Sequence, residues 1–158
     1  MITTQKSPGT HNPGSPTLPV RIPPDARHAR TVRDALIAFS SFHGVSDADL
    51  EAMIFAVGEA LANAIEHGAP AKDIDVDVAI EVDLINARVI DQGSGLARSP
   101  VGLAPLPDGL CERGRGIPIM QRFADHVDMQ SIPGKGTVVT LVRYRRASRR
   151  NQERTVAS

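Results

Sequence analysis

The sequence predicts an α+β fold, a sandwich in which helices pack on one face of a mixed, mainly antiparallel sheet. Two observations predict it. Apolar residues recur at helical spacing in the first half of the chain, and they alternate with polar residues in several later segments. The 158 residues and 41% hydrophobic content suit one domain with one core. We expect this domain over residues 18–144, between a disordered leader over 1–17 and a basic disordered tail over 145–158.

The chain is expected to begin its fold with a strand and a helix. Apolar residues alternate with others over Leu18–Ile22, and Pro23 ends that run, as is typical of a short strand. Asp25 is suited to begin the following helix, and apolar residues keep the helical period until Gly44 interrupts it. A strand and a helix therefore succeed each other before residue 45.

A second, longer helix is expected between Ser46 and Gly68. Ser46 is a good N-cap residue, and Asp49 three positions later completes a near capping box. Gly68 is placed just past the last turn, where helices commonly end. The apolar stripe of this helix consists of Leu50, Ile54, Val57, Leu61 and Ile65.

The same helix carries a polar column formed by Glu59, Asn63 and His67, which share one face because each is four residues from the next. The column is expected roughly opposite the apolar stripe, flanked by the small residues Ala52 and Ala56, so that something approaches it closely. An ordinary solvated face would include cations, yet residues 34–71 contain no Lys or Arg. The column looks like a metal and phosphate site. The alternative is a buried helix with a few satisfied polar groups.

The second half of the chain predicts four strands, one helix and one long loop. Alternation of apolar and polar residues indicates the strands, and three prolines with two glycines indicate the loop. The expected strands are 74–80, 84–90, 127–132 and 137–144, the loop is 96–113, and the helix runs from Gly116 to Phe123 or Ala124.

Three glycine-rich motifs follow the polar column along the chain: Asp91-Gln-Gly-Ser-Gly95, Gly114-Arg-Gly-Ile117 and Pro133-Gly-Lys-Gly-Thr137. Each is a weak signal alone. In this order, and after Glu59-Ala-Leu-Ala-Asn-Ala-Ile65, they resemble the N, G1, G2 and terminal Gly-Thr boxes of the GHKL ATP-binding superfamily. The resemblance covers residues 18–144. The segments 59–65 and 116–120 are most similar to its anti-sigma-factor serine/threonine protein kinase branch.

This resemblance implies a Bergerat-type two-layer sandwich that binds ATP with Mg²⁺, and an ATP lid in the loop 96–113. Asn63 would hold Mg²⁺ against the phosphates, because an amide oxygen is a hard neutral ligand. Glu59 would be the catalytic base that accepts the proton of an attacking serine hydroxyl or water. If nothing is transferred, Glu59 would only orient metal-bound water. For His67, a phosphate-side contact and a helix-end hydrogen bond remain equal alternatives.

The superfamily pattern also assigns the base pocket. Asp91 would accept the exocyclic amino proton that adenine has and guanine lacks. Gly93 and Gly95 would leave room for the nucleotide against the backbone. Thr137 would support adenine through its hydroxyl or a bound water. Together these residues would select the purine.

The phosphates would meet the start of the third predicted helix. Gly114, Arg115 and Gly116, in one box with Ile117, lie where free backbone N–H groups and the helix dipole favour anions. The alternative for Arg115 is a surface charge on a loop. Pro118 departs from the pattern, since relatives often have a less rigid residue there, but proline is tolerated near a helix start. We expect ATP binding to survive this departure, which would alter lid closure and slow turnover.

The resemblance implies a cytoplasmic ATP-dependent serine/threonine protein kinase that acts as an anti-sigma factor. It would phosphorylate a small anti-anti-sigma partner of the STAS type and sequester a sigma factor. Arg27 and Arg30 lie where this branch places its partner face. Homodimerisation is usual in the branch, and no membrane span or secretory signal is visible in the sequence. The alternative function is a non-catalytic ATP-sensing regulatory binding module.

A third hypothesis, nucleic-acid binding, would use the arginines near the C-terminus. Phosphate attraction needs only positive charge, but aromatic residues make up only 3% of the chain, so a platform for stacking bases is absent. We therefore interpret the basic end as a solvated or partner-tuning extension. Its arginines are Arg143, Arg145, Arg146, Arg149, Arg150 and Arg154.

Overall fold

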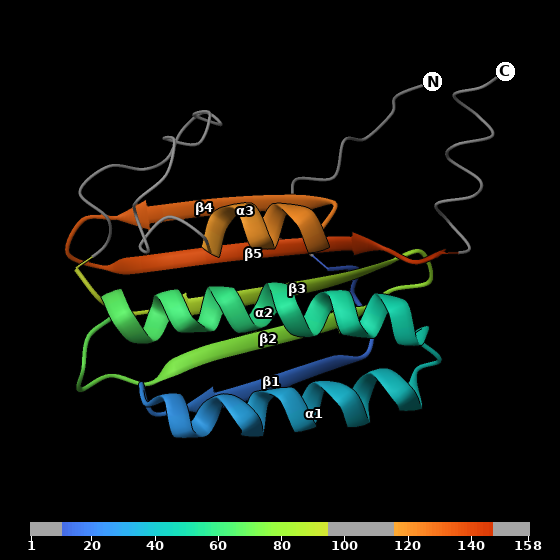
Figure 1. Ribbon diagram of the computed structural model, residues 1–158, viewed down its shortest axis with the longest axis horizontal. Coiled ribbons are helices and arrows are strands. Elements are labelled where there is room, and N and C mark those ends of the chain that lie inside the picture. Colours follow the sequence, from blue (N-terminus) through green and yellow to red (C-terminus); the bar gives the residue numbers. More distant parts are fainter. Residues whose placement is uncertain (1–10, 95–115, 147–158) are drawn as a thin grey trace, which may run out of the picture.

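In the computed structural model, which describes residues 11–94 and 116–146, three α-helices cover one face of a five-stranded sheet (Figure 1). The α+β sandwich predicted from the sequence is confirmed. The strand order is β1-β2-β3-β5-β4, so β1 and β4 form the two edges. The strands are β1 (Thr17–Ile22), β2 (Ile74–Ile80), β3 (Leu84–Asp91), β4 (His126–Ile132) and β5 (Gly136–Tyr144).

All four strand pairings in the described part of the chain are antiparallel, so the sheet that was predicted to be mainly antiparallel contains no parallel pair there. The physical reason lies in the connections. β1 and β2 are separated by two helices, whereas a single helix would return the chain for a parallel pairing. The second helix brings the chain back to the end of β1, so that Ile22 pairs with Ile74. The pairs β2–β3 and β4–β5 are joined by short turns, which require antiparallel strands.

The helices begin and end close to the predicted positions. Asp25 caps a 3₁₀ turn (Ala26–His28), which leads into α1 (Ala29–Phe42). Ser46 is the N-cap of α2 (Asp47–His67), and its hydroxyl accepts the backbone N–H of Asp49. The helix α3 is Gly116–Phe123. None of the helices in the described ranges is long and apolar enough to cross a membrane.

The buried face of α2 differs from the predicted stripe. The middle of that face is a row of alanines, while Leu50, Ile54 and Ile65 are only partly buried. The helix lies between α1 and α3 and over the sheet (Figure 1), so small residues allow close packing on several sides. The polar column consequently lies at the border with α3 rather than opposite the core. The alanines of the row are Ala52, Ala56, Ala60 and Ala64.

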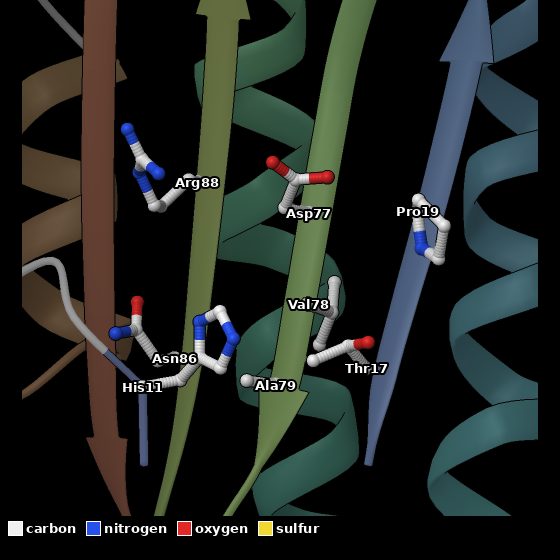
Figure 2. Close-up of a pocket in the computed structure, with 8 residues that line it drawn as sticks. All are labelled: His11, Thr17, Pro19, Asp77, Val78, Ala79, Asn86 and Arg88. Atoms are coloured by element: carbon white, nitrogen blue, oxygen red, sulfur yellow. The ribbon is translucent and has the colours of Figure 1, made fainter. Parts of the chain in front are cut away.

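Residues 11–16, expected within a disordered leader, contact the fold. The backbone N–H and side-chain amide of Asn12 donate to the carboxylate of Glu81, and the carbonyl of Pro16 accepts the N–H of Ile80. Figure 2 shows His11 beside Asn86 on the sheet face that the helices leave open. A pocket of about 180 Å³ lies there. Asn86 lines it, and its Oδ1 is buried without a hydrogen-bond partner among the described residues.

The basic end of the chain is not simply solvated either. The guanidinium of Arg145 donates to carbonyls of Glu81 and Val82 in the β2–β3 turn and of His43 and Gly44 in the α1–α2 loop. The sequence pattern did not indicate these contacts, because the acceptor carbonyls lie 63 to 102 positions earlier in the chain. Residues 147–158, with the remaining arginines, lie outside the described part.

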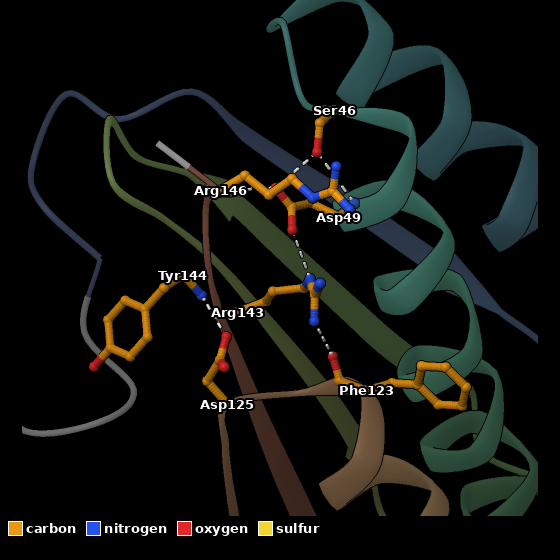
Figure 3. Close-up of polar contacts among 7 residues, drawn as sticks. All are labelled: Ser46, Asp49, Phe123, Asp125, Arg143, Tyr144 and Arg146. Atoms are coloured by element: carbon orange, nitrogen blue, oxygen red, sulfur yellow. Dashed lines mark hydrogen bonds and ion pairs between the residues drawn. The ribbon is translucent and has the colours of Figure 1, made fainter. Parts of the chain in front are cut away.

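Asp49 is the centre of a polar cluster that joins three elements (Figure 3). Its carboxylate accepts hydrogen bonds from the hydroxyl of Ser46 (2.8 Å), from Nε of Arg143 (2.9 Å) and from the backbone N–H of Arg146 (3.0 Å). The second arm of Arg143, Nη1, donates to the carbonyl of Phe123 at 2.8 Å. The cluster therefore connects the start of α2, the end of α3 and the end of β5.

This cluster carries a buried ion pair, since the side chains of Asp49 and Arg143 are 1% and 11% exposed. Burial alone would raise the pKa of Asp49. The hydrogen bonds from Ser46, Arg146 and Arg143, together with the charge of Arg143, more than offset that effect, so the pKa lies below its ordinary value of 3.8. Because the pKa is lowered in the folded state, the ionised carboxylate stabilises the fold above the unfolded-state pKa.

We expect Asp49→Asn to lower the free energy of unfolding at pH 7 by about 3 kcal/mol, because the variant leaves Arg143 as an unpaired, largely buried charge. As the pH falls through the lowered pKa of Asp49, the wild-type protein loses the same stabilisation, so the difference should shrink below about pH 4. Urea unfolding of both proteins from pH 7 to pH 3 measures this. Asp47→Asn, at an exposed position of the same helical turn, is the control.

Candidate functional site

A pocket of about 130 Å³ lies between the second half of α2, the start of α3, the end of β3, the first half of β5 and the middle of β4. Most of its wall is apolar, and four polar side chains and one glycine complete it. The apolar residues are Ala60, Ala64, Val89, Ile117, Met129 and Val139, and the others are Asn63, His67, Asp91, Gly116 and Thr137. The structure thus brings together six of the residues that the sequence proposed for nucleotide binding.

Asp91 and Thr137 form the polar floor of this pocket. They are directly opposite one another in the pairing of β3 with β5, and they are only 8% and 7% exposed. One oxygen of Asp91, Oδ1, accepts the backbone N–H of Gly93 at 2.8 Å. The hydroxyl of Thr137 lies 3.3 Å from that of Ser131. A carboxylate is therefore held at the end of a buried strand with a hydroxyl beside it.

Gly136 shapes the backbone around Asp91, a role that sequence reasoning did not assign to it. Its φ is +115°, a conformation that favours glycine. A Cβ added to it would lie 2.1 Å from the carbonyl oxygen of Asp91 and 2.9 Å from Cα of Gln92. The turn before β5 therefore packs directly on the backbone that carries the carboxylate. The sequence signal for this was the second glycine of the Pro133–Thr137 motif.

Gly93 also allows a close approach, but between two segments of the protein. A Cβ on Gly93 would lie 2.8 Å from both Cα of Gly68 and the carbonyl oxygen of His67, and 3.0 Å from Oδ1 of Asp91. The turn after β3 is thus packed against the end of α2. This contact brings the floor of the pocket and the polar column of α2 together.

The polar column of α2 faces the start of α3. A Cβ on Gly116 would lie 3.1 Å and 3.2 Å from the amide nitrogen and oxygen of Asn63, and 3.4 Å from Oε2 of Glu59. Asn63 lines the pocket, whereas Glu59, one turn earlier, is half-buried beside Gly116 and is not among the lining residues. His67 lines the pocket with an exposed side chain whose Nε2 lies 3.9 Å from Glu66.

Several predicted site residues are not in this pocket. Gly95, Gly114 and Arg115, and the lid expected over 96–113, lie outside the described residues. Arg27 and Arg30 are exposed on the 3₁₀ turn and α1. Arg27 pairs with Asp25 at 2.7 Å and holds the pKa of that carboxyl at about 2, and Arg30 lies 3.5 Å from Asp34.

The chemistry of the pocket suits a flat ring with a phosphate chain. Apolar side chains from α2, α3 and three strands form the walls, and Asp91 offers a hydrogen-bond acceptor at the floor. At the other end, the start of α3 and the amide of Asn63 offer groups for an anion and a cation. Within the described ranges, His, Cys, Asp and Glu form no cluster of three that could hold a metal. The pocket on the open face of the sheet shares none of these lining residues.

Comparison with known proteins identifies this arrangement. The family model described as "Histidine kinase-like ATPase domain" matches residues 22–143, which include the polar column, the pocket floor and the start of α3. The chain belongs to the histidine kinase-like ATPase family. This family corresponds to the GHKL superfamily that the motifs predicted, and membership implies ATP binding.

Relatives narrow the family to its anti-sigma-factor branch. The chain is 33% identical to an "Anti-sigma F factor" of Pasteuria penetrans over 125 residues, 73% of this chain and 83% of that protein. It is 36% identical to an "Anti-sigma F factor" of Thermoanaerobacter sp. (strain X514) over 94 residues, 56% of this chain. That match spans 66% of the length of the relative.

A solved structure supports the fold of the histidine kinase-like domain. The crystal structure of the RsbU and RsbW domains of a Mycobacterium tuberculosis protein matches 84% of this chain with a TM-score of 0.64 and 24% identity. The match covers 33% of that longer chain. At this identity the similarity establishes the fold alone.

We expect Gly136→Ala to lower the free energy of unfolding by about 3 kcal/mol or more, because the added methyl would overlap the backbone of Asp91 in a conformation unfavourable for alanine. Gly134→Ala is the matched control, since its φ of +76° is also positive but a Cβ there meets no atom of the described residues within 4 Å. The control should lose only about 1–2 kcal/mol. Equal losses in urea denaturation would contradict the proposed close packing.

Proposed function

We propose that this chain binds ATP in the pocket between α2, α3 and the sheet, with Asp91 selecting adenine. The observation that carries the proposal is the buried carboxylate of Asp91 at the floor of an apolar pocket. Its Oδ1 is occupied by the N–H of Gly93, and Oδ2 makes no hydrogen bond to the described residues. Oδ2 is therefore available to accept the exocyclic amino group of adenine. Thr137 supports the ring from β5.

Asn63 is the proposed protein ligand of Mg²⁺. Its amide lies against Gly116 at the start of α3, where backbone N–H groups attract phosphates, so the metal and the phosphates would meet between α2 and α3. Mg²⁺ usually takes few ligands from the protein and completes its shell with phosphate oxygens and water. When bound, it would neutralise charge that develops on the phosphates during transfer.

The reaction we propose is transfer of the γ-phosphoryl group to a serine or threonine of a partner protein. The hydroxyl oxygen attacks the γ-phosphorus, Glu59 accepts the hydroxyl proton, and ADP leaves with the electrons of the broken P–O bond. The position of Glu59 supports this role, because its carboxylate lies next to Asn63 and Gly116 but outside the base pocket. Arg115 and Gly114, in the adjoining box, would contact the phosphates.

The names of the relatives suggest the biological partners. Because similar proteins are named anti-sigma F factor, we propose that the chain sequesters a sigma factor and phosphorylates a small anti-anti-sigma protein of the STAS type. Arg27 and Arg30 are exposed and are not among the residues that line the pocket, and they would contribute to the partner surface. A homodimer and a cytoplasmic location remain part of this proposal.

A non-catalytic ATP-sensing module is the second candidate function. The observation that favours it is that Oε2 of Glu59 and the amide of Asn63, the proposed Mg²⁺ ligand, both lie against Gly116, so Glu59 could orient metal-bound water without accepting a proton from a substrate. In that case ATP would only order the surface that binds the partner. The two candidates share the nucleotide site and differ in phosphoryl transfer.

We expect Asp91→Asn to weaken ATP binding about 10- to 100-fold, because a hydrogen bond to a charged group contributes about 1.5–3 kcal/mol. The carbonyl oxygen of the asparagine can still accept the N–H of Gly93, so the turn should be preserved. Titration calorimetry with ATP and Mg²⁺ measures the affinity. Asp77→Asn, on the open face of the sheet, is the control and should bind ATP as the wild type does. Unchanged affinity of the Asp91 variant would contradict the assignment.

Glu59→Gln separates the two candidate functions. For a kinase, the variant should transfer at least about 100-fold less phosphate to a STAS-type substrate, since general-base catalysis contributes 10²–10⁴-fold. Its ATP affinity should stay within a few fold of the wild type. The assay is ³²P transfer from ATP, with Glu51→Gln at an exposed position of α2 as the control. Wild-type protein that binds ATP but transfers no phosphate supports the sensing module.

A further inference from the structure

We propose that Arg143 is a positioning residue that holds α3 in place for phosphate binding. This inference rests on the proposed ATP site, because it concerns how the phosphate end of that site is aligned. Arg143 is on β5 and contacts α2 and α3 at the ends opposite to those that carry the pocket residues Asn63 and Gly116. It would therefore act through α3 rather than by touching the nucleotide.

The helix α3 has few anchors of its own. It comprises only eight residues, and it packs chiefly against α2 rather than against the sheet. Its main contacts with α2 are apolar: Met120 is fully buried, and the ring of Phe123 stacks on that of Phe55 with centroids 4.8 Å apart. Apolar contacts are non-directional and permit small shifts along the helix axis. Directional contacts help to set the axial position of the helix: Asp125, just beyond it, is hydrogen-bonded to Val142 and Tyr144 of β5, and a contact with the helix itself adds to these.

Arg143 supplies that contact at the end of α3. Its Nη1 donates to the carbonyl of Phe123, the last residue of the helix, at 2.8 Å. Carbonyl groups of the last turn lack partners within the helix, and the C-terminal end of the helix dipole attracts a cation. The guanidinium of Arg143 both donates to an unpaired carbonyl and places a positive charge at this end of the helix. The end of α3 is thereby tied to the side chain of Arg143.

The other arm of Arg143 is tied to α2. Its Nε donates to Asp49, which is 1% exposed and fixed in the first turn of α2 by Ser46. Because α2 also carries Asn63, Arg143 links the end of α3 to the same helix that bears the proposed metal ligand. Eight residues of helix span only about 12 Å. A displacement at Phe123 would therefore reach Gly116, which lies against Asn63.

Arg145, one residue past the end of β5, provides a matched comparison. Its guanidinium also makes several hydrogen bonds, but their acceptors are carbonyls of the β2–β3 turn and the α1–α2 loop. Among the described residues, those bonds do not involve α3. Both arginines stabilise the fold, and only Arg143 is bound to the helix that leads to the phosphate end of the pocket.

The test is Arg143→Lys, with Arg145→Lys as the control. Lysine keeps the charge and can pair with Asp49, but it lacks the planar fork that reaches two acceptors in fixed geometry. Affinities for ATP and for adenosine are measured by competition with a fluorescent ADP analogue, at 25 °C, after circular dichroism has shown that each variant is folded. We expect Arg143→Lys to weaken ATP binding about tenfold. Adenosine affinity should fall much less, because Asp91 and Thr137 are on the sheet and α3 lines the pocket only with Gly116 and Ile117.

A merely structural role for Arg143 would give a different pattern. If Arg143→Lys binds ATP like the wild type, or loses ATP and adenosine affinity equally, or if Arg145→Lys shows the same selective loss, the proposal is overturned. If the wild-type protein binds neither ligand, the proposed function itself fails. Should Arg143→Lys be unfolded, Arg143→Gln is measured in the same way, with the same selective loss of ATP affinity expected.

Discussion

The close packing of α2 between two helices and the sheet is the constraint on which the rest of the structure depends. A row of alanines permits it, because larger side chains at these four positions would separate α2 from its neighbours. The same helix carries Asp49 near its start and Asn63 near its end. The position of one helix therefore sets both the buried ion pair and the polar side of the nucleotide pocket.

The site lies where the ends of several helices and strands and the turns that follow or precede them meet. Backbone contacts through Gly93 and Gly136 bring the end of β3, the end of α2 and the turn before β5 within van der Waals distance. These contacts restrict the backbone of Asp91, so its carboxylate is already held at the floor of the pocket before any ligand binds. Preorganised polar groups of this kind bind their ligands without paying for their own ordering. By contrast, α3 contributes through one helix end and depends on distant contacts for its position.

Most helices and strands could be predicted from neighbouring residues in the sequence. The buried face of α2 and the hydrogen-bond partners of Arg143 could not. The capping of α2 by Ser46 and the alternation in β2 are set by neighbouring residues, so the sequence shows them directly. The alanine face of α2 was missed because alanine carries little hydrophobic signal and its burial depends on α1 and α3. The partners of Arg143 were equally invisible, since Asp49 is 94 positions away and a run of arginines resembles a solvated tail.

Both edges of the sheet carry features that discourage another strand from joining. β1 has Pro19 in its middle, which contributes no backbone N–H to a neighbouring chain. β4, at the opposite edge, bears the charged and polar residues Asp128 and Gln130, whose side chains are hydrogen-bonded to each other. Protected edges of this kind lower the tendency toward intermolecular sheet extension. Another protein would therefore meet the helical layer or the open face of the sheet more readily than it would extend the described sheet at either edge.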